Sequence, residues 1–133
     1  MMCTAAEPLV LPAQQQIVQH WLAGLRRQYP RCDAARVETQ IHDAIRNFYK
    51  FLSGYPAAWD LNPLMLLLSR QPSFQDLAHV FSTLRAAVRA AISDSSKQTV
   101  LCTTEHLDNW ITQVVMHYDV ARTHRSQQRW QDM

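Results

Sequence analysis

The chain has 133 residues, a formal net charge of +2, 47% hydrophobic residues and 18% charged residues. This apolar content is enough for the core of one domain and excludes a disordered chain, while the mild charge gives no reason to expect nucleic acid as a partner. The sequence holds two glycines, too few for a sheet with many tight turns. The composition therefore predicts an all-α fold.

The chain starts with a predicted flexible leader over residues 1–11, because Pro8 and Pro12 disfavour a helix before Pro12. A first helix is predicted from Pro12 to about Tyr29, where Pro30 ends it. Apolar residues recur along it at spacings of three and four, as one face of a helix requires: Ile17, Val18, Trp21, Leu22, Leu25 and Tyr29.

A second helix is predicted after an N-cap at Asp33, and Gly54 is placed to end it in a left-handed conformation. Its apolar stripe is Val37, Ile41, Ile45, Phe48 and Leu52. After a loop, Asn62 and Pro63 read as the N-cap and first residue of a short apolar helix over 64–70.

A fourth helix is predicted from the turn at Pro72 and Ser73 onward. Ser73 and Asp76 have the spacing of a capping box, with aspartate in place of glutamate. The apolar stripe that follows is Leu77, Val80, Phe81, Leu84, Val88, Ala91 and Ile92. Residues 93–96 form the next loop.

The last helix is predicted from about Lys97 onward, since neither glycine nor proline interrupts the sequence to its end. Its predicted core seam has heptad-like spacing: Val100, Thr104, Leu107, Ile111, Val114, Tyr118 and Ala121. A helix of about 30 residues would be about 45 Å long, more than a domain of this size needs for its own core. We interpret 12–121 as a helical domain and 122–133 as an exit helix toward a missing downstream module. A frayed polar tail is the alternative.

These elements predict a helical bundle of four long helices plus one short apolar helix, with antiparallel neighbours and a globin-like arrangement as one variant. No GxSxG, P-loop, GxGxxG or HExxH motif occurs. Carboxylates are few and fit helix caps, so we expect no catalytic residue and no enzyme activity of this domain.

The three cysteines, Cys3, Cys32 and Cys102, form no CxxC pair, so neither a structural zinc site nor a redox dithiol is predicted. A reducing cytoplasm fits this usage best. The longest strongly apolar run, 64–68, is far shorter than a membrane span. We therefore expect a soluble cytoplasmic domain with no metal, no membrane span and no resident cofactor.

The histidines divide into two sets. His20, His42 and His79 lie singly beside the apolar stripes of separate helices. Each is a candidate haem ligand if the fold is globin-like, and a partly buried core neighbour otherwise.

The second set lies on one face of the last helix and predicts an interface stripe: His106, Trp110, Gln113, His117 and His124. A helix patterned on two faces packs on two sides. We therefore predict a homodimer through this helix, weakened when the histidines are protonated. A polar flank is the alternative reading, and Trp110 is also expected, with Trp21 and Trp59, to anchor the core.

Two stretches carry a family resemblance. The first is Trp21-Leu-Ala-Gly-Leu25, followed by Tyr29-Pro30, and the second runs from Pro72 to Arg85, with an aromatic later at Tyr118. Together they resemble the RsbRD-type N-terminal domains that precede histidine kinases, regulators and stressosome proteins. The resemblance implies a helical input or scaffold domain without catalytic residues, related to globin-like domains that bind no haem.

The leading functional hypothesis is a non-enzymatic sensory or regulatory input domain of a bacterial-type signalling protein. It would relay a signal through its C-terminal helix to a downstream signalling domain of the same chain. The alternatives are a globin-like sensor that binds haem or another small ligand, and a DNA-binding regulator module.

Overall fold

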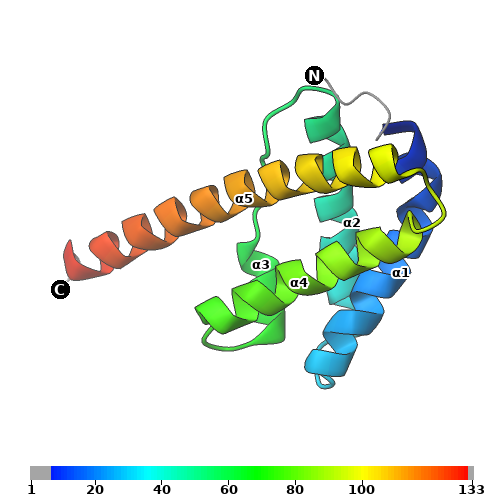
Figure 1. Ribbon diagram of the computed structural model, residues 1–133. Helices are drawn as coiled ribbons and strands as arrows, with labels where there is room; N and C mark the ends of the chain where they lie inside the picture. Colours follow the sequence, from blue (N-terminus) through cyan, green and yellow to red (C-terminus); the bar gives the residue numbers. More distant parts are fainter. Residues whose placement is uncertain (1–6, 132–133) are drawn as a thin grey trace.

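The computed structural model describes the backbone of residues 7–131 and the side chains of residues 14–118. Five helices follow one another in this part of the chain: α1 (Glu7–Gln28), α2 (Ala34–Leu52), α3 (Asn62–Leu68), α4 (Phe74–Ala91) and α5 (Lys97–Gln131) (Figure 1). No strand occurs within residues 7–131. The prediction of an all-α fold with four long helices and one short helix is confirmed.

The long helices form two antiparallel pairs that cross one another. In Figure 1, α1 and α2 run in opposite directions, and α4 and α5 form a second pair that lies across them. Helix α1 packs against both α2 and α4, while α5 contacts α4 and α2. The connections within the pairs, residues 29–33 and 92–96, are short. A short connection between two helices makes them antiparallel neighbours.

The core lies where the two pairs meet. Its largest fully buried side chains include Trp21 of α1, Phe48 of α2, Leu84 of α4 and Trp110 of α5. Full burial of a large apolar side chain contributes about 1.5–3 kcal/mol to folding. The predicted apolar stripes of the first, second and fourth helices therefore stabilise the contact between the two helix pairs.

Three of the predicted helix ends are confirmed in atomic detail. Asp33 caps α2, its Oδ1 accepting from the N–H of Arg36 at 3.3 Å. Gly54 follows α2 with a φ of 99°, a conformation that side chains disfavour. Ser73 and Asp76 form the capping box of α4, because Ser73 N–H donates to Asp76 Oδ2 at 2.9 Å and Asp76 N–H donates to Ser73 Oγ at 3.3 Å.

The same capping residue ties α4 to α1. The hydroxyl of Tyr29, just after α1, donates to Asp76 Oδ1 at 2.6 Å. This bond, followed by the bond from Ser73 N–H, holds the pKa of the Asp76 carboxyl below its ordinary value. Burial, with the carboxylate as a second cause, raises the pKa of Tyr29.

Three predicted boundaries are wrong. Helix α1 begins at Glu7 and not at Pro12. Pro8 stands in the first turn, where a helix needs no N–H, and Pro12 removes one hydrogen bond, which does not stop the helix. Helix α3 ends at Leu68, and its N-cap is Leu61 without a side-chain bond. Asn62 is the first residue of the helix rather than its N-cap, and its backbone N–H donates to Asp60 Oδ1 at 3.0 Å.

Helix α5 is the longest element, with 35 residues and a length of about 52 Å. Its C-terminal part extends past the other helices (Figure 1). The side chains that it buries in the described range are Thr99, Cys102, Thr103, Leu107, Trp110, Ile111, Val114 and Tyr118. The predicted seam is thus right from Leu107 to Tyr118, whereas Val100 and Thr104 are only half-buried and Ala121 lies outside the described side chains.

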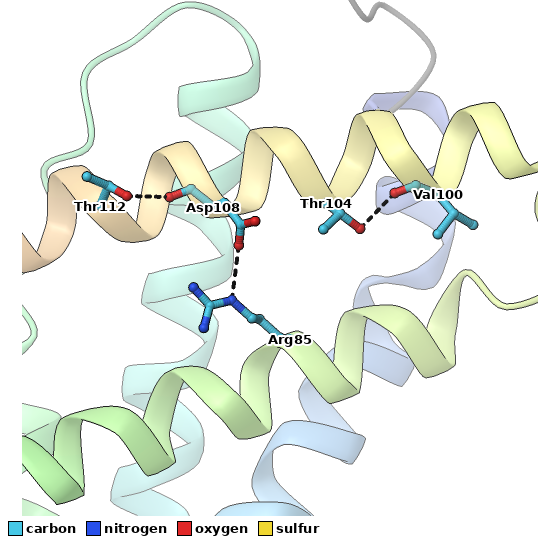
Figure 2. Close-up of polar contacts among 5 residues, drawn as sticks. All are labelled: Arg85, Val100, Thr104, Asp108 and Thr112. Carbon is cyan, nitrogen blue, oxygen red and sulfur yellow. Dashed lines mark hydrogen bonds and ion pairs between the residues drawn. The ribbon is translucent and has the colours of Figure 1, made fainter.

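The outer contact between α4 and α5 is polar (Figure 2). Arg85 Nε lies 3.0 Å from Asp108 Oδ1. Within α5 itself, Thr104 and Thr112 donate their hydroxyls to the carbonyls of Val100 and Asp108, each at 2.8 Å. Both charged side chains are about half exposed, so this pair contributes less than about 1 kcal/mol to stability.

The cysteines differ in state. Cys32 is half-buried with a free thiol, whereas Cys102 on α5 is buried and disulfide-bonded. Cys3 lies outside the described residues. Disulfides are typical of oxidising compartments, so this bond weighs against the inference from cysteine spacing to a reducing cytoplasm. In the part of the chain that the structure describes, no helix combines the length and apolarity needed to cross a bilayer.

Candidate functional site

Three tryptophans from distant parts of the chain meet in the core. Trp21 comes from α1, Trp59 from the segment between α2 and α3, and Trp110 from α5. The rings of Trp59 and Trp110 are stacked, with centroids 5.8 Å apart and planes 13° apart. Trp21 meets Trp59 edge-on at 6.2 Å, and Phe48 meets Trp110 edge-on at 5.5 Å. The expectation that all three tryptophans anchor the core is confirmed.

The indole N–H groups of this cluster are not equivalent. Trp21 Nε1 donates to the carbonyl of Val80 at 3.1 Å, and Trp110 Nε1 donates to Asn47 Oδ1 at 2.9 Å. Trp59 is 7% exposed, and its Nε1 is buried without a hydrogen-bond partner. A buried donor without an acceptor destabilises a fold by about 1–3 kcal/mol. The hydroxyl of Thr103 on α5 is the other buried side-chain group without a partner among the described residues.

Asn47 is a contact residue that the sequence did not reveal. Its Oδ1 accepts from Trp110 Nε1 and also from the backbone N–H of Ala58 at 3.1 Å. One amide oxygen thereby joins α2, the 53–61 segment and α5. A polar residue at the edge of the α2 stripe was the available signal, but nothing in the sequence identifies partners 11 and 63 residues away.

Two hollows flank the segment that carries Trp59. The first has a volume of about 580 Å³ and is lined by residues 56–61 and by His117 and Tyr118 of α5. The second has a volume of about 480 Å³ and is lined by residues 58–60, Pro63 and five polar side chains of α2: Gln40, Asp43, Arg46, Asn47 and Lys50. Trp59 and its neighbours on either side form the wall between them.

The two hollows differ in charge. The first is lined mostly by apolar groups, with the carboxylate of Asp60 and the exposed ring of His117 as its titratable side chains apart from the Tyr118 phenol. The second holds charges of both signs, and Arg46 NH1 lies 3.4 Å from Asp43 Oδ1. A mixed, exposed ion-pair surface is an ordinary solvated helix face, so the first hollow is the better candidate for a ligand site.

The predicted haem ligands lie away from both hollows. His20 is exposed, and His42 and His79 are half-buried. His42 Nε2 lies 3.7 Å from Glu38 Oε1 on the same helix. Neither hollow is lined by any of the three histidines, and the described residues hold no group of three or more His, Cys, Asp and Glu side chains placed to bind a metal ion.

The predicted interface stripe on α5 is not a continuous surface. Trp110 is fully buried, because it lies three residues after Leu107 and four before Val114 and thus shares the core face of the helix. His106 is half-buried, whereas Gln113 and His117 are exposed. The side chain of His124 lies outside the described range.

Comparison with known proteins adds no relative: no family model, no curated protein and no solved structure matches the chain. Its function is therefore argued from its own residues.

Proposed function

We propose that the chain is a non-enzymatic sensory or regulatory input domain of a bacterial-type signalling protein. It relays a signal through α5 to a downstream domain such as a histidine kinase or stress regulator. The observation that carries the proposal is the form of α5: one face of the helix packs in the core as far as Tyr118, and the same helix continues to Gln131 beyond the other helices (Figure 1).

A continuous helix is a mechanical link, because a shift or rotation of its packed half moves its other half as well. The packed half of α5 holds Trp110 and Tyr118, which connect it to the tryptophan cluster and to the first hollow. A change at either place therefore reaches the free half directly. The resemblance to RsbRD-type domains supports the same function.

The proposal includes a homodimer through α5 and a cytoplasmic location. The disulfide at Cys102 weighs against that location, and alkylation of Cys102 with and without reductant tests it. Because Trp110 belongs to the core, the exposed part of the predicted stripe that can face a partner within the described side chains is Gln113 and His117. Sedimentation at neutral and mildly acidic pH tests this dimer. A wild-type chain that stays monomeric at high micromolar concentration contradicts it.

A ligand-binding sensor is the second candidate, and the hollow beside Trp59 is the observation that favours it. The haem form of that candidate has no comparable support in the positions of His20, His42 and His79. An absorption spectrum of the purified protein tests it, since a Soret band would restore the haem form.

The relay is tested with a spacer series. The full chain is fused through its last residue to the dimerisation and catalytic core of a histidine kinase, with zero to seven alanines inserted at the junction. Helical relay predicts that autophosphorylation rises and falls with a period of about 3.6 residues. Glycine–serine spacers of the same lengths are the control and should abolish the periodicity. Equal activity with every alanine spacer contradicts the proposal.

A further inference from the structure

We propose that one end of the helical bundle, the basic end, contacts the surface of an anionic lipid bilayer. The basic end is formed by the last turn of α1, the 29–33 turn, the first turn of α2, the 69–73 connection and the first turn of α4. Its arginines are Arg26, Arg27, Arg31, Arg36 and Arg70. This inference goes beyond the proposed signalling function and does not depend on it.

The basic end joins two connections that are far apart in the sequence. Tyr29, in the turn after α1, donates its hydroxyl to Asp76 Oδ1 at 2.6 Å, and Asp76 Oδ2 accepts from the N–H of Ser73 at 2.9 Å. Figure 1 shows both connections at the lower edge of the molecule, below α4. Arg31 of the first connection and Arg70 of the second therefore lie at the same end of the bundle.

Four of the five arginines have no counter-ion. All five side chains are exposed. Arg36 Nε lies 3.5 Å from Asp33 Oδ2, but no carboxylate of the described residues forms an ion pair with the other four. A guanidinium group bonds two phosphate oxygens at once through its planar fork, so these four side chains are suited to phosphate groups.

The positive charge of the chain is concentrated at this end. Five arginines stand against two carboxylates, those of Asp33 and Asp76. Glu38 lies in the next turn of α2, beside His42. Even with Glu38 included, this end carries as much positive charge as the net +2 of the whole chain.

Helix stability explains only part of this charge. Basic residues in the last turn of α1 stabilise its C-terminus, which accounts for Arg26 and Arg27. Arg31 lies after α1 and before α2, and Arg70 lies after α3 and before α4, so neither stabilises the last turn of a helix. The surface that these residues form therefore calls for an anionic partner.

Exposed apolar side chains favour a bilayer over other anionic partners. Leu66 and Phe74 are 55% and 70% exposed, and they stand on either side of the connection that carries Arg70. Nucleic acid offers phosphates but no apolar phase for an exposed leucine. The surface of an anionic bilayer accommodates both kinds of side chain, since arginine binds at the level of the phosphates and apolar groups enter the boundary of the acyl chains.

Vesicle co-sedimentation of the full chain tests this contact. The probes are vesicles of phosphatidylcholine alone and vesicles that also contain about 30% phosphatidylglycerol, both at millimolar lipid and low ionic strength. We expect the chain to bind the anionic vesicles, to dissociate from them as salt is added, and to bind phosphatidylcholine alone only weakly.

Two charge-matched variants locate the surface that binds. The first replaces the four unpaired arginines: Arg26→Gln, Arg27→Gln, Arg31→Gln and Arg70→Gln. The second removes the same charge from exposed positions elsewhere: Arg46→Gln, Lys50→Gln, Arg89→Gln and Lys97→Gln. A basic residue near an anionic surface contributes about fivefold to binding, so the first variant should bind at least about 100-fold more weakly and the second less than about tenfold.

The apolar part of the surface is tested with Leu66→Ala and Phe74→Ala together. This variant keeps every arginine, so its binding should remain salt-dependent while its affinity for the anionic vesicles falls. An affinity equal to that of the wild type would contradict insertion of these side chains.

A wild-type chain that does not bind the anionic vesicles overturns the proposal, as does binding that the four arginine substitutions at the basic end leave unchanged. Tighter binding to a DNA duplex than to the anionic vesicles at the same salt concentration also overturns it and assigns the basic end to nucleic acid. The first reading needs no variant, and circular dichroism shows whether the variants keep their helices. The spacer series tests the relay separately, because the basic end lies outside α5.

Discussion

Asn47 accepts hydrogen bonds from two residues that lie far from it in the sequence. It is the hydrogen-bond acceptor for Trp110 Nε1 and for the N–H of Ala58. We expect Asn47→Ala to lower the free energy of unfolding by about 1–3 kcal/mol, because it leaves a buried indole N–H unpaired. Urea denaturation followed by tryptophan fluorescence measures the change.

The matched control is Asn47→Asp, which keeps an acceptor oxygen at the same place. Its stability should stay much closer to that of the wild type than the stability of Asn47→Ala. If both variants unfold at the same urea concentration as the wild type, the two hydrogen bonds do not contribute to stability.

The bond between Tyr29 and Asp76 predicts a pH effect. A carboxyl whose pKa is lower in the folded than in the unfolded chain contributes stability above the unfolded value of about 3.9, and this stability is lost as the pH falls through the folded pKa. Tyr29→Phe removes the largest cause of the lowering. We therefore expect the pKa of Asp76 to rise toward its ordinary value.

A ¹³C NMR titration of the Asp76 carboxyl carbon measures this shift, and acid unfolding of Tyr29→Phe should begin at a higher pH than that of the wild type. Tyr55→Phe is the control, since Tyr55 is 62% exposed. An Asp76 titration that Tyr29→Phe leaves unchanged would show that the hydroxyl bond is absent in solution.

At the scale of single residues, the sequence predicts contacts between residues that are close along the chain and does not predict contacts between distant residues. Asp33, Gly54 and the Ser73–Asp76 box were predicted because cap chemistry involves residues three or four apart. The partners of Asn47 and the unpaired N–H of Trp59 depend on how α2, the 53–61 segment and α5 meet in space. No spacing in the sequence carries that information.

At the scale of helices, the close contact of α1 with α4 depends on Gly24. A Cβ atom at Gly24 would lie 3.2 Å from Thr83 Cγ2 of α4, closer than ordinary van der Waals contact. We expect Gly24→Val to lower the free energy of unfolding by about 1–3 kcal/mol, because the helices must separate to admit the side chain. Chemical denaturation measures the loss.

Ala23→Val is the control, since Ala23 is the exposed neighbour on the same helix. Helix propensity alone predicts the opposite order, because valine is a better helix former than glycine and a worse one than alanine. A Gly24→Val protein that is more stable than its parent would therefore contradict close packing at this point.

The helices also show why part of the α5 stripe was wrong. Spacings of three and four describe a face about a third of the helix circumference wide, and Trp110 lies near its edge. The same pattern therefore allowed both an outer stripe and a core position. The position of α2, which supplies Phe48 and Asn47, decides in favour of the core.

At the scale of the whole molecule, composition predicts the all-α class, and the apolar stripes with their caps predict the number of helices. The crossing of the two helix pairs depends on which stripes face one another. The disulfide bond at Cys102 also belongs to this scale, because its formation depends on the fold as a whole. We expect iodoacetamide to modify Cys32 and not Cys102 in denatured, unreduced protein, as measured by mass spectrometry of peptides.

Prior treatment with dithiothreitol is the control and should make Cys102 reactive. Modification of Cys102 without reductant would contradict the disulfide and would favour the cytoplasmic location. The same measurement on protein expressed in a reducing and in an oxidising compartment shows which of them forms the bond.

The stacked pair of Trp59 and Trp110 has an optical consequence. Two indole rings 5.8 Å apart and inclined by 13° couple their electronic transitions. The coupled pair adds a signal to the far-ultraviolet circular dichroism spectrum, where the backbone of the helices also absorbs. Trp59→Leu should therefore change the ellipticity in this region even if every helix remains intact, and helix content calculated from such a spectrum would be in error by the indole contribution.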